Sequence, residues 1–117
     1  MLIVLPPSET KAPGGTDAAI SLSFPSLDAV RTSLIDVLTA TDVDTQMREL
    51  KIPAGKRAEA EENLALRTAP VMPAIERYTG VLYDALDAST LSDAALARLA
   101  VGSALFGVVR AGDLIPR

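Results

Sequence analysis

The stretch RLAVGSALFGVVRAGDLI, residues 98–115, decides the fold class. It combines β-branched residues with several glycines, which predicts a buried strand that leads into a tight turn. A second strand is predicted at residues 2–5, LIVL, an apolar run that ends at Pro6 and Pro7 because proline donates no ladder hydrogen bond. With helical patterns between them, these runs predict an α+β fold that is mostly helical and has at least two short buried strands.

Helical periodicity dominates the rest of the chain. Residues 27–38 predict an amphipathic helix in which Arg31 lies off an inward-facing stripe made of Leu27, Val30, Leu34, Ile35 and Leu38. Further helices are predicted after the N-caps Asp42 and Ser92, from Pro53 to about Thr68, and from Pro73 towards Gly80. The run VLYDAL, residues 81–86, fits a helical turn and a strand equally well.

Composition narrows the chemistry that this chain can perform. Its 117 residues, 49% of them hydrophobic and 22% charged, predict one folded unit over residues 1–117. It contains no His, Cys or Trp, which excludes a Ser-His-Asp triad, a cysteine nucleophile, a Cys/His zinc site and a thiol switch within these residues. The groups that remain for catalysis are carboxylates and the side chains of Lys, Tyr, Ser and Thr. We expect no metal site and no cofactor.

We expect a cytoplasmic protein with no membrane partner. The apolar run at the N-terminus is too short for a signal peptide and lacks basic residues before it. The longest uncharged apolar stretch, residues 99–109, falls well short of the ~20 residues that span a bilayer. The formal net charge of −4 opposes long-range attraction to nucleic acid, although basic residues concentrate between residues 48 and 77.

The loop PPSETK, residues 6–11, is one candidate site because it follows a predicted strand. With its two hydroxyl groups, Ser8 and Thr10, the loop would either hold an anion through Lys11 and backbone N–H groups or place Glu9 as a general base. The alternative is an ordinary solvated loop.

Two further motifs carry candidate groups. In RYTGVLYDAL, residues 77–86, the N–H groups around Gly80 would meet a DNA phosphate, whereas Tyr78 and Tyr83 would stack, donate their hydroxyls or simply fill the core. Arg110 lies three residues before Asp113, so it would either bind an anion in a cleft or pair with Asp113 to close a turn.

MLIVLPPSETK, RYTGVLYDAL and GSALFGVVRAGDLIP resemble, in order and spacing, the YaaA family of bacterial peroxide-stress proteins, and actinobacterial members in particular. Other branches carry Ser-Pro-Ala-Lys-Thr where this chain has residues 6–10. Both forms share Pro7, Thr10, Gly80, Tyr83, Ser103, Gly107, Arg110 and Asp113. Family members continue into a second half, so we expect this chain to be the N-terminal part of the family's mixed fold.

The resemblance implies a response to hydrogen peroxide that limits free iron, together with binding of double-stranded DNA in a basic cleft. We expect phosphate contacts from Arg67, Arg77 and Arg110, and the full set of DNA- or anion-binding candidates is Ser8, Thr10, Lys11, Arg67, Arg77, Gly80, Tyr83 and Arg110.

Two alternatives remain. One is an enzyme whose pocket lies between PPSETK and GVVRAGD, with Glu9 as base and Arg110 or Lys11 holding the substrate. The other is an interaction domain that self-associates through an exposed apolar surface, which we expect on the C-terminal side.

Overall fold

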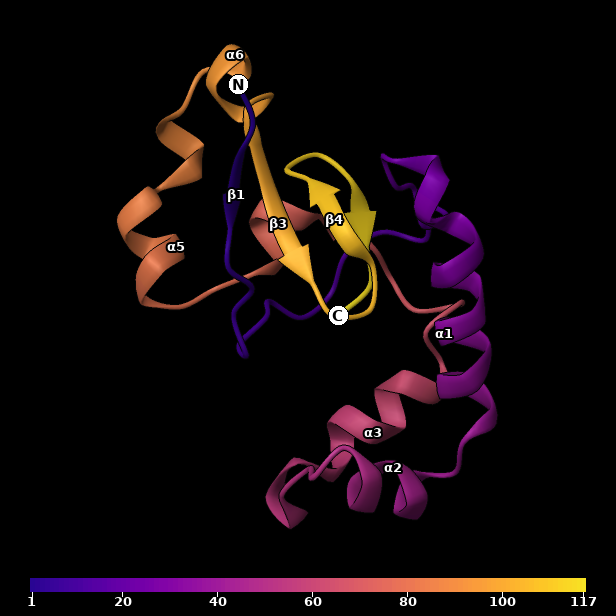
Figure 1. The fold of residues 1–117 in the computed structure, drawn as a ribbon. Helices are drawn as coiled ribbons and strands as arrows, with labels where there is room; N and C mark the ends of the chain where they lie inside the picture. The colour runs from indigo at the N-terminus through magenta and orange to yellow at the C-terminus, as the bar shows by residue number, and fades with distance from the viewer.

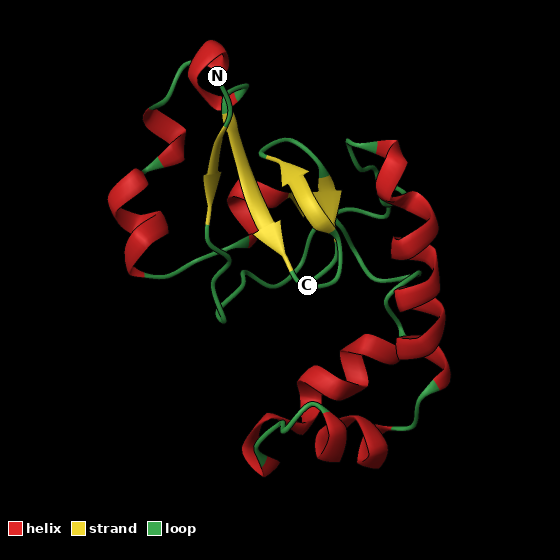
Figure 2. Ribbon diagram, in the orientation of Figure 1, coloured by secondary structure: helices red, strands yellow, loops and turns green.

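The computed structural model describes all 117 residues and contains two small sheets and six α-helices (Figures 1 and 2). In the first sheet, β3 (Leu99–Ser103) lies between β1 (Ile3–Leu5), to which it is parallel, and β4 (Gly107–Arg110), to which it is antiparallel. The second sheet pairs β2 (Met72–Pro73) with β5 (Leu114–Ile115). The prediction of an α+β fold is confirmed.

The stretch 98–115 forms three strands rather than the single strand predicted for it. β3 and β4 make a hairpin whose turn spans residues 104–106, and Gly107, with a φ of 73°, begins β4 directly after it. In the turn, the backbone N–H of Phe106 donates to Ser103 Oγ at 3.1 Å. The chain turns again after β4 and pairs β5 with β2. The glycines therefore mark the hairpin turn as well as the end of a strand.

The helices occupy the segments between the two predicted strand regions, and two of them begin at predicted N-caps. They are α1 (Asp28–Ala40), α2 (Val43–Glu49), α3 (Arg57–Leu64), α4 (Ala74–Arg77), α5 (Val81–Leu86) and α6 (Asp93–Leu96), with 3₁₀ turns at Pro25–Leu27, Ala54–Lys56 and Ala88–Thr90. The side chains of Asp42 and Ser92 accept from backbone N–H groups three residues later, which confirms both N-caps. The ambiguous run 81–86 is helical, and the helix predicted to reach Thr68 ends at Leu64.

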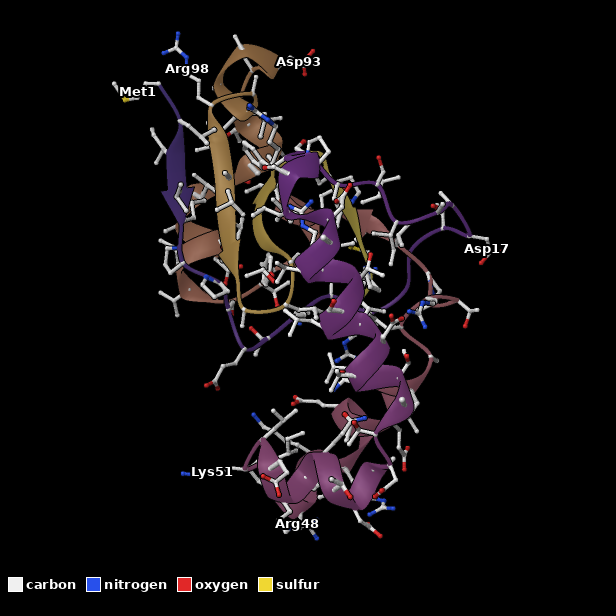
Figure 3. The ribbon with its side chains drawn as sticks, turned by 45° about the vertical axis from the view of Figure 1, so that its right-hand side comes forward. Met1, Asp17, Arg48, Lys51, Asp93 and Arg98 are labelled. Carbon is white, nitrogen blue, oxygen red and sulfur yellow. The ribbon has the colours of Figure 1, made fainter.

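The core lies around the hairpin, and α1 to α3 form an arm that extends away from it (Figure 1). Seven buried residues make up the core: Ala74, Tyr78, Tyr83, Val101, Phe106, Val109 and Ile115. Figure 3 shows Arg48 and Lys51 at the far end of the arm, opposite Met1 and Arg98. No helix has the length and apolar character needed to cross a membrane.

α1 docks on the hairpin through a buried arginine, which corrects the predicted apolar stripe. Val30 and Leu34 are exposed, whereas Arg31 is buried. Arg31 Nε donates to the carbonyl of Phe106 at 2.7 Å and Nη2 donates to that of Val108 at 2.9 Å. Periodicity places arginine on the solvent side of a helix, but its planar fork also fits carbonyl groups at a turn.

The exposed apolar residues lie on other elements than expected. No large apolar residue between 99 and 117 is strongly exposed, so the apolar surface predicted for the C-terminal side is wrong. These side chains are buried because the hairpin folds over the core. β1 was predicted to be buried, yet it is the edge strand of its sheet, with Ile3 47% and Val4 53% exposed.

Arg77, at the end of α4, is fully buried and holds three backbone segments together. Nη1 donates to the carbonyls of Ala12 at 2.7 Å and Gly14 at 2.9 Å, and Nη2 donates to those of Pro70 at 2.9 Å and Ile115 at 3.1 Å. Burial lowers the pKa of the Arg77 guanidinium below its ordinary value.

Replacing Arg77 with Lys tests this role. Lysine keeps the charge but loses the planar fork, so several buried carbonyls lose their donors, and we expect the free energy of unfolding to fall by about 3 kcal/mol. Urea denaturation measures the change. The control is Arg67→Lys, an exposed residue paired with Asp36, for which we expect a loss of at most about 1 kcal/mol. Equal effects of the two variants would contradict the assignment.

Candidate functional site

The loop 6–11 and the segment 77–83 meet in space although they lie far apart in the sequence. The N–H of Thr79 donates to the carbonyl of Thr10 at 3.1 Å, and the N–H of Ala12 donates to that of Arg77 at 2.7 Å. Lys11 and Tyr78 form an antiparallel bridge between these bonds. Two of the three motifs quoted above thus make one site.

Hydroxyl groups fix the shape of the loop at this junction. Thr10 Oγ1 donates to the carbonyl of Thr79 at 2.8 Å and lies 3.1 Å from Ser8 Oγ, which in turn accepts from the N–H of Thr10 at 3.2 Å. Ser8 and Thr10 therefore position the chain on either side of Glu9, whose side chain is exposed.

Gly80 is required by the conformation of the backbone. Its φ of 119° and ψ of −173° lie in a region that only glycine adopts readily. A Cβ at this position would lie 3.2 Å from Ser8 Oγ and 3.3 Å from Thr10 Oγ1. The close approach of the loop thus depends on the missing side chain.

Tyr78 and Tyr83 fill the core beneath the loop, which was one of the roles predicted for them. The centroids of the two rings are 5.8 Å apart, and the ring planes are inclined by 22°. The Tyr83 hydroxyl donates to the carbonyl of Pro6 at 2.6 Å. Burial raises the pKa of both Tyr78 and Tyr83. Tyr83 thus links the core to the start of the loop.

Lys11 lies above this aromatic pair at the wall of a cavity. Its Nζ is 5.9 Å from the centroid of the Tyr78 ring, and it forms no ion pair. Burial lowers the pKa of the Lys11 amine, and the charges of Glu59 and Glu62 partly oppose that shift. A partly desolvated, unpaired ammonium group is a ready partner for an anion.

The cavity has a volume of about 460 Å³ and lies between the loop and the helical arm. Its walls are formed by Glu9, Thr10, Lys11, Ile52, Lys56, Glu59, Glu62, Asn63 and Arg117. Arg117 Nη1 pairs with Glu62 Oε1 at 3.2 Å, whereas Lys56, like Lys11, forms no ion pair. Lys11 and Lys56 are therefore the free cations of this cavity, which we call the Lys11 cavity.

Sequence reasoning missed Lys56 and Arg117. Neither belongs to a motif, and both reach the Lys11 cavity only because α3 and the end of the chain fold against the loop. For Lys56 the one available signal was the concentration of basic residues between 48 and 77, and Arg117 had none.

Arg110 lies at a different place from the Lys11 cavity. It lines a second cavity of about 720 Å³ with Glu76, Leu96 and Asp113, and its guanidinium stacks 5.0 Å from the centroid of Phe24. Asp113 Oδ2 accepts from the backbone N–H of Arg110 at 2.9 Å, so Asp113 closes the turn through the main chain. The pocket expected between PPSETK and GVVRAGD is not formed by these cavities, because Glu9 lines one and Arg110 the other.

The other two predicted phosphate contacts differ in their accessibility. Arg67 is exposed and pairs with Asp36, and its Nη1 donates to Thr39 Oγ1 at 3.1 Å. Arg77 has no exposed surface, and backbone carbonyls occupy its guanidinium. Arg77 is therefore structural, because its donors do not reach solvent. No cluster of three or more acidic side chains with the proximity of a metal site is present.

Comparison with known proteins agrees with the resemblance drawn from the three motifs. The profile of a family described as "Peroxide stress protein YaaA" matches residues 1–117. UPF0246 proteins of Corynebacterium efficiens and Corynebacterium glutamicum are 60% and 57% identical over 119 residues, and one of Streptomyces coelicolor is 44% identical over 126 residues. Each match covers 99% of this chain but only 48–49% of the relative, so the chain spans about half the length of these proteins.

Substituting Gly80 tests the junction. In Gly80→Ala the Cβ strains the backbone and crowds two hydroxyls, so we expect the free energy of unfolding to fall by about 2 kcal/mol. Gly112→Ala is the control, because nothing lies within 4 Å of a Cβ there. Thermal and urea unfolding of both variants measure the difference, and a Gly80→Ala protein as stable as Gly112→Ala would overturn this account of the junction.

The lowered pKa of Lys11 predicts a specific pH dependence. Burial makes the charged amine less favourable in the folded chain than in the unfolded one, so the protonated amine costs stability at pH 7, and this cost disappears as the pH rises through the folded pKa towards 10.5. Lys11→Met keeps the apolar stem and removes the charge. We expect its stability relative to the wild type to be greatest near pH 7 and to shrink towards pH 10.5. Urea unfolding across this range measures the difference, in which the contributions of Tyr78 and Tyr83 cancel. A difference independent of pH would contradict the prediction.

Proposed function

This chain belongs to the YaaA family of peroxide stress proteins, and we propose that it serves the response to hydrogen peroxide in the cytoplasm by binding double-stranded DNA and limiting free iron. The observation that carries the DNA-binding part is the Lys11 cavity, where two unpaired ammonium groups stand beside a loop rich in hydroxyl groups. Family membership supports the role in peroxide stress.

The groups at the cavity suit a phosphate. Lysine binds phosphate oxygens as a point charge, and serine or threonine hydroxyls are common additional donors. Lys11 reaches the cavity from the loop and Lys56 from the arm, and Ser8 accepts a hydrogen bond from the N–H of Thr10, which also lines the cavity. A phosphate bound between them would lose part of its hydration shell and contact two ammonium groups that have no carboxylate partner in the free protein.

Because the chain is acidic overall, its attraction to DNA depends on short-range contacts with individual phosphates. Its formal net charge is −4, and Glu9, Glu59 and Glu62 share the cavity with the cations. Long-range attraction to DNA is therefore weak, and affinity depends on the few phosphates that reach the free cations. Arg67 and Arg110 are exposed but lie away from this cavity, so they would add contacts at separate places.

The iron part of the proposal rests on family membership. With no His or Cys in this chain, carboxylates are the side chains here with affinity for iron, and the rest of the longer relatives supplies any other ligands. Measuring free iron in peroxide-treated cells that carry or lack the full-length gene tests this part directly, and equal iron levels would refute it.

An enzymatic function is the second candidate, because Glu9 and Lys11 share one cavity. Lys11 would hold an anionic substrate and Glu9 would act as the base. The substitution Glu9→Gln separates the two proposals, since it removes a base but also removes a negative charge that repels phosphate. DNA affinity unchanged or increased in Glu9→Gln favours DNA binding.

A salt titration on duplex DNA tests the phosphate contact. Each phosphate contact contributes about −0.9 to the slope of log Kobs against log salt, so Lys11→Gln and Lys56→Gln are each expected to make the slope less negative by about that amount. Lys51→Gln is the matched control, because Lys51 lies at the end of the arm (Figure 3) and does not line the cavity. The C. efficiens relative should be titrated in parallel. A slope that none of the cavity variants changes, or that Lys51→Gln changes equally, would disprove the contact.

A further inference from the structure

The outer edge of β1 exposes an apolar strand. Ile3 and Val4 are 47% and 53% exposed, although they belong to the apolar run 2–5. β1 has β3 as its one partner, and Figures 1 and 3 both show it at the outer side of the sheet. Only 17 of the 117 residues are buried, so the apolar surface that β1 leaves exposed is large compared with the buried apolar surface of this core.

The sequence of β1 is that of a strand covered on both faces. Strands in parallel pairing that are buried on both sides have continuous apolar runs rather than alternating patterns. Successive side chains point to opposite faces, so the exposure of Ile3 and Val4 means that both faces of β1 are open. Its partner β3 has Ala100 and Val101 fully buried. Both strands have apolar sequences, but only β3 is covered.

The backbone of β1 is also open along one side. The N–H of Ile3 donates to the carbonyl of Arg98 at 2.7 Å, towards β3. Because the bonding direction alternates along a strand, the N–H and C=O of Val4 point outward, away from β3. Such groups are a template for another strand. The open edge ends at Pro6, which has no N–H and whose carbonyl accepts from Tyr83.

We infer that β1 is an interior strand in the full-length proteins of this family, paired along its outer edge by a strand from the half that this chain does not match. The relatives provide that occupant, since the matched region is about half of their length. A three-residue edge buries far less than the roughly 1,200 Å² of a stable interface, which argues against a second copy. A segment of the same polypeptide needs no such area, because its effective concentration is high.

Hydrogen exchange on the full-length C. efficiens relative, compared with this chain, tests the inference. We expect the amide that aligns with Val4 to exchange at least ~100-fold more slowly in the full-length protein, because there it donates to a neighbouring strand. The amide that aligns with Ile3 is the internal control, since it already donates to the carbonyl of residue 98 and is protected in both.

A substitution provides the second readout. Val4→Asp should change the Tm of this chain by no more than about 2 °C, because the side chain is exposed, but should lower that of the full-length relative by several degrees at the aligned position. Equal exchange of the Val4 amide in both proteins, or equal effects of the substitution, would overturn the inference. Protection of Val4 that appears in this chain only at high concentration would also overturn it, because a second copy would then occupy the edge.

Discussion

The guanidinium of Arg77 binds backbone carbonyls from three segments that are remote in the sequence, and the position of the candidate site depends on it. Ala12 and Gly14 follow the PPSETK loop, Pro70 precedes β2, and Ile115 belongs to β5. A buried charge of this kind is costly unless its donors are satisfied, and here they are. The geometry that satisfies them also fixes where the loop leaves the core, and so where Lys11 lies.

Much of the fold follows from local sequence signals. Asp42 and Ser92 cap helices as predicted, and Gly107 directly follows the hairpin turn, because caps and turns depend on a few neighbouring residues. The burial of Arg31 and Arg77 could not be read from the sequence. Their carbonyl partners come from distant segments, and helical periodicity assigns arginine to the solvent side.

The candidate site was likewise predictable where it depends on local motifs and unpredictable where it depends on contacts between distant segments. The loop 6–11 and Gly80 belong to motifs, and the structure brings them together. Lys56 joins them only through the fold of the arm and Arg117 only through the path of the chain end, and Arg110, although part of a motif, lies at another cavity. The continuous apolar sequence of β1, typical of a strand covered on both faces, was equally misleading, because Ile3 and Val4 are exposed in this structure.

Chemical-shift mapping by NMR of this chain with a short DNA duplex tests the central claim, that the junction of the loop and the arm is the phosphate-binding site. We expect shifts concentrated at residues 8–11, at Lys56 and Asn63 on the arm, and at Arg117, with Phe24 and Arg110 unaffected. Shifts confined to the surface around Arg110, or no shifts at a duplex concentration that saturates the C. efficiens relative, would contradict it.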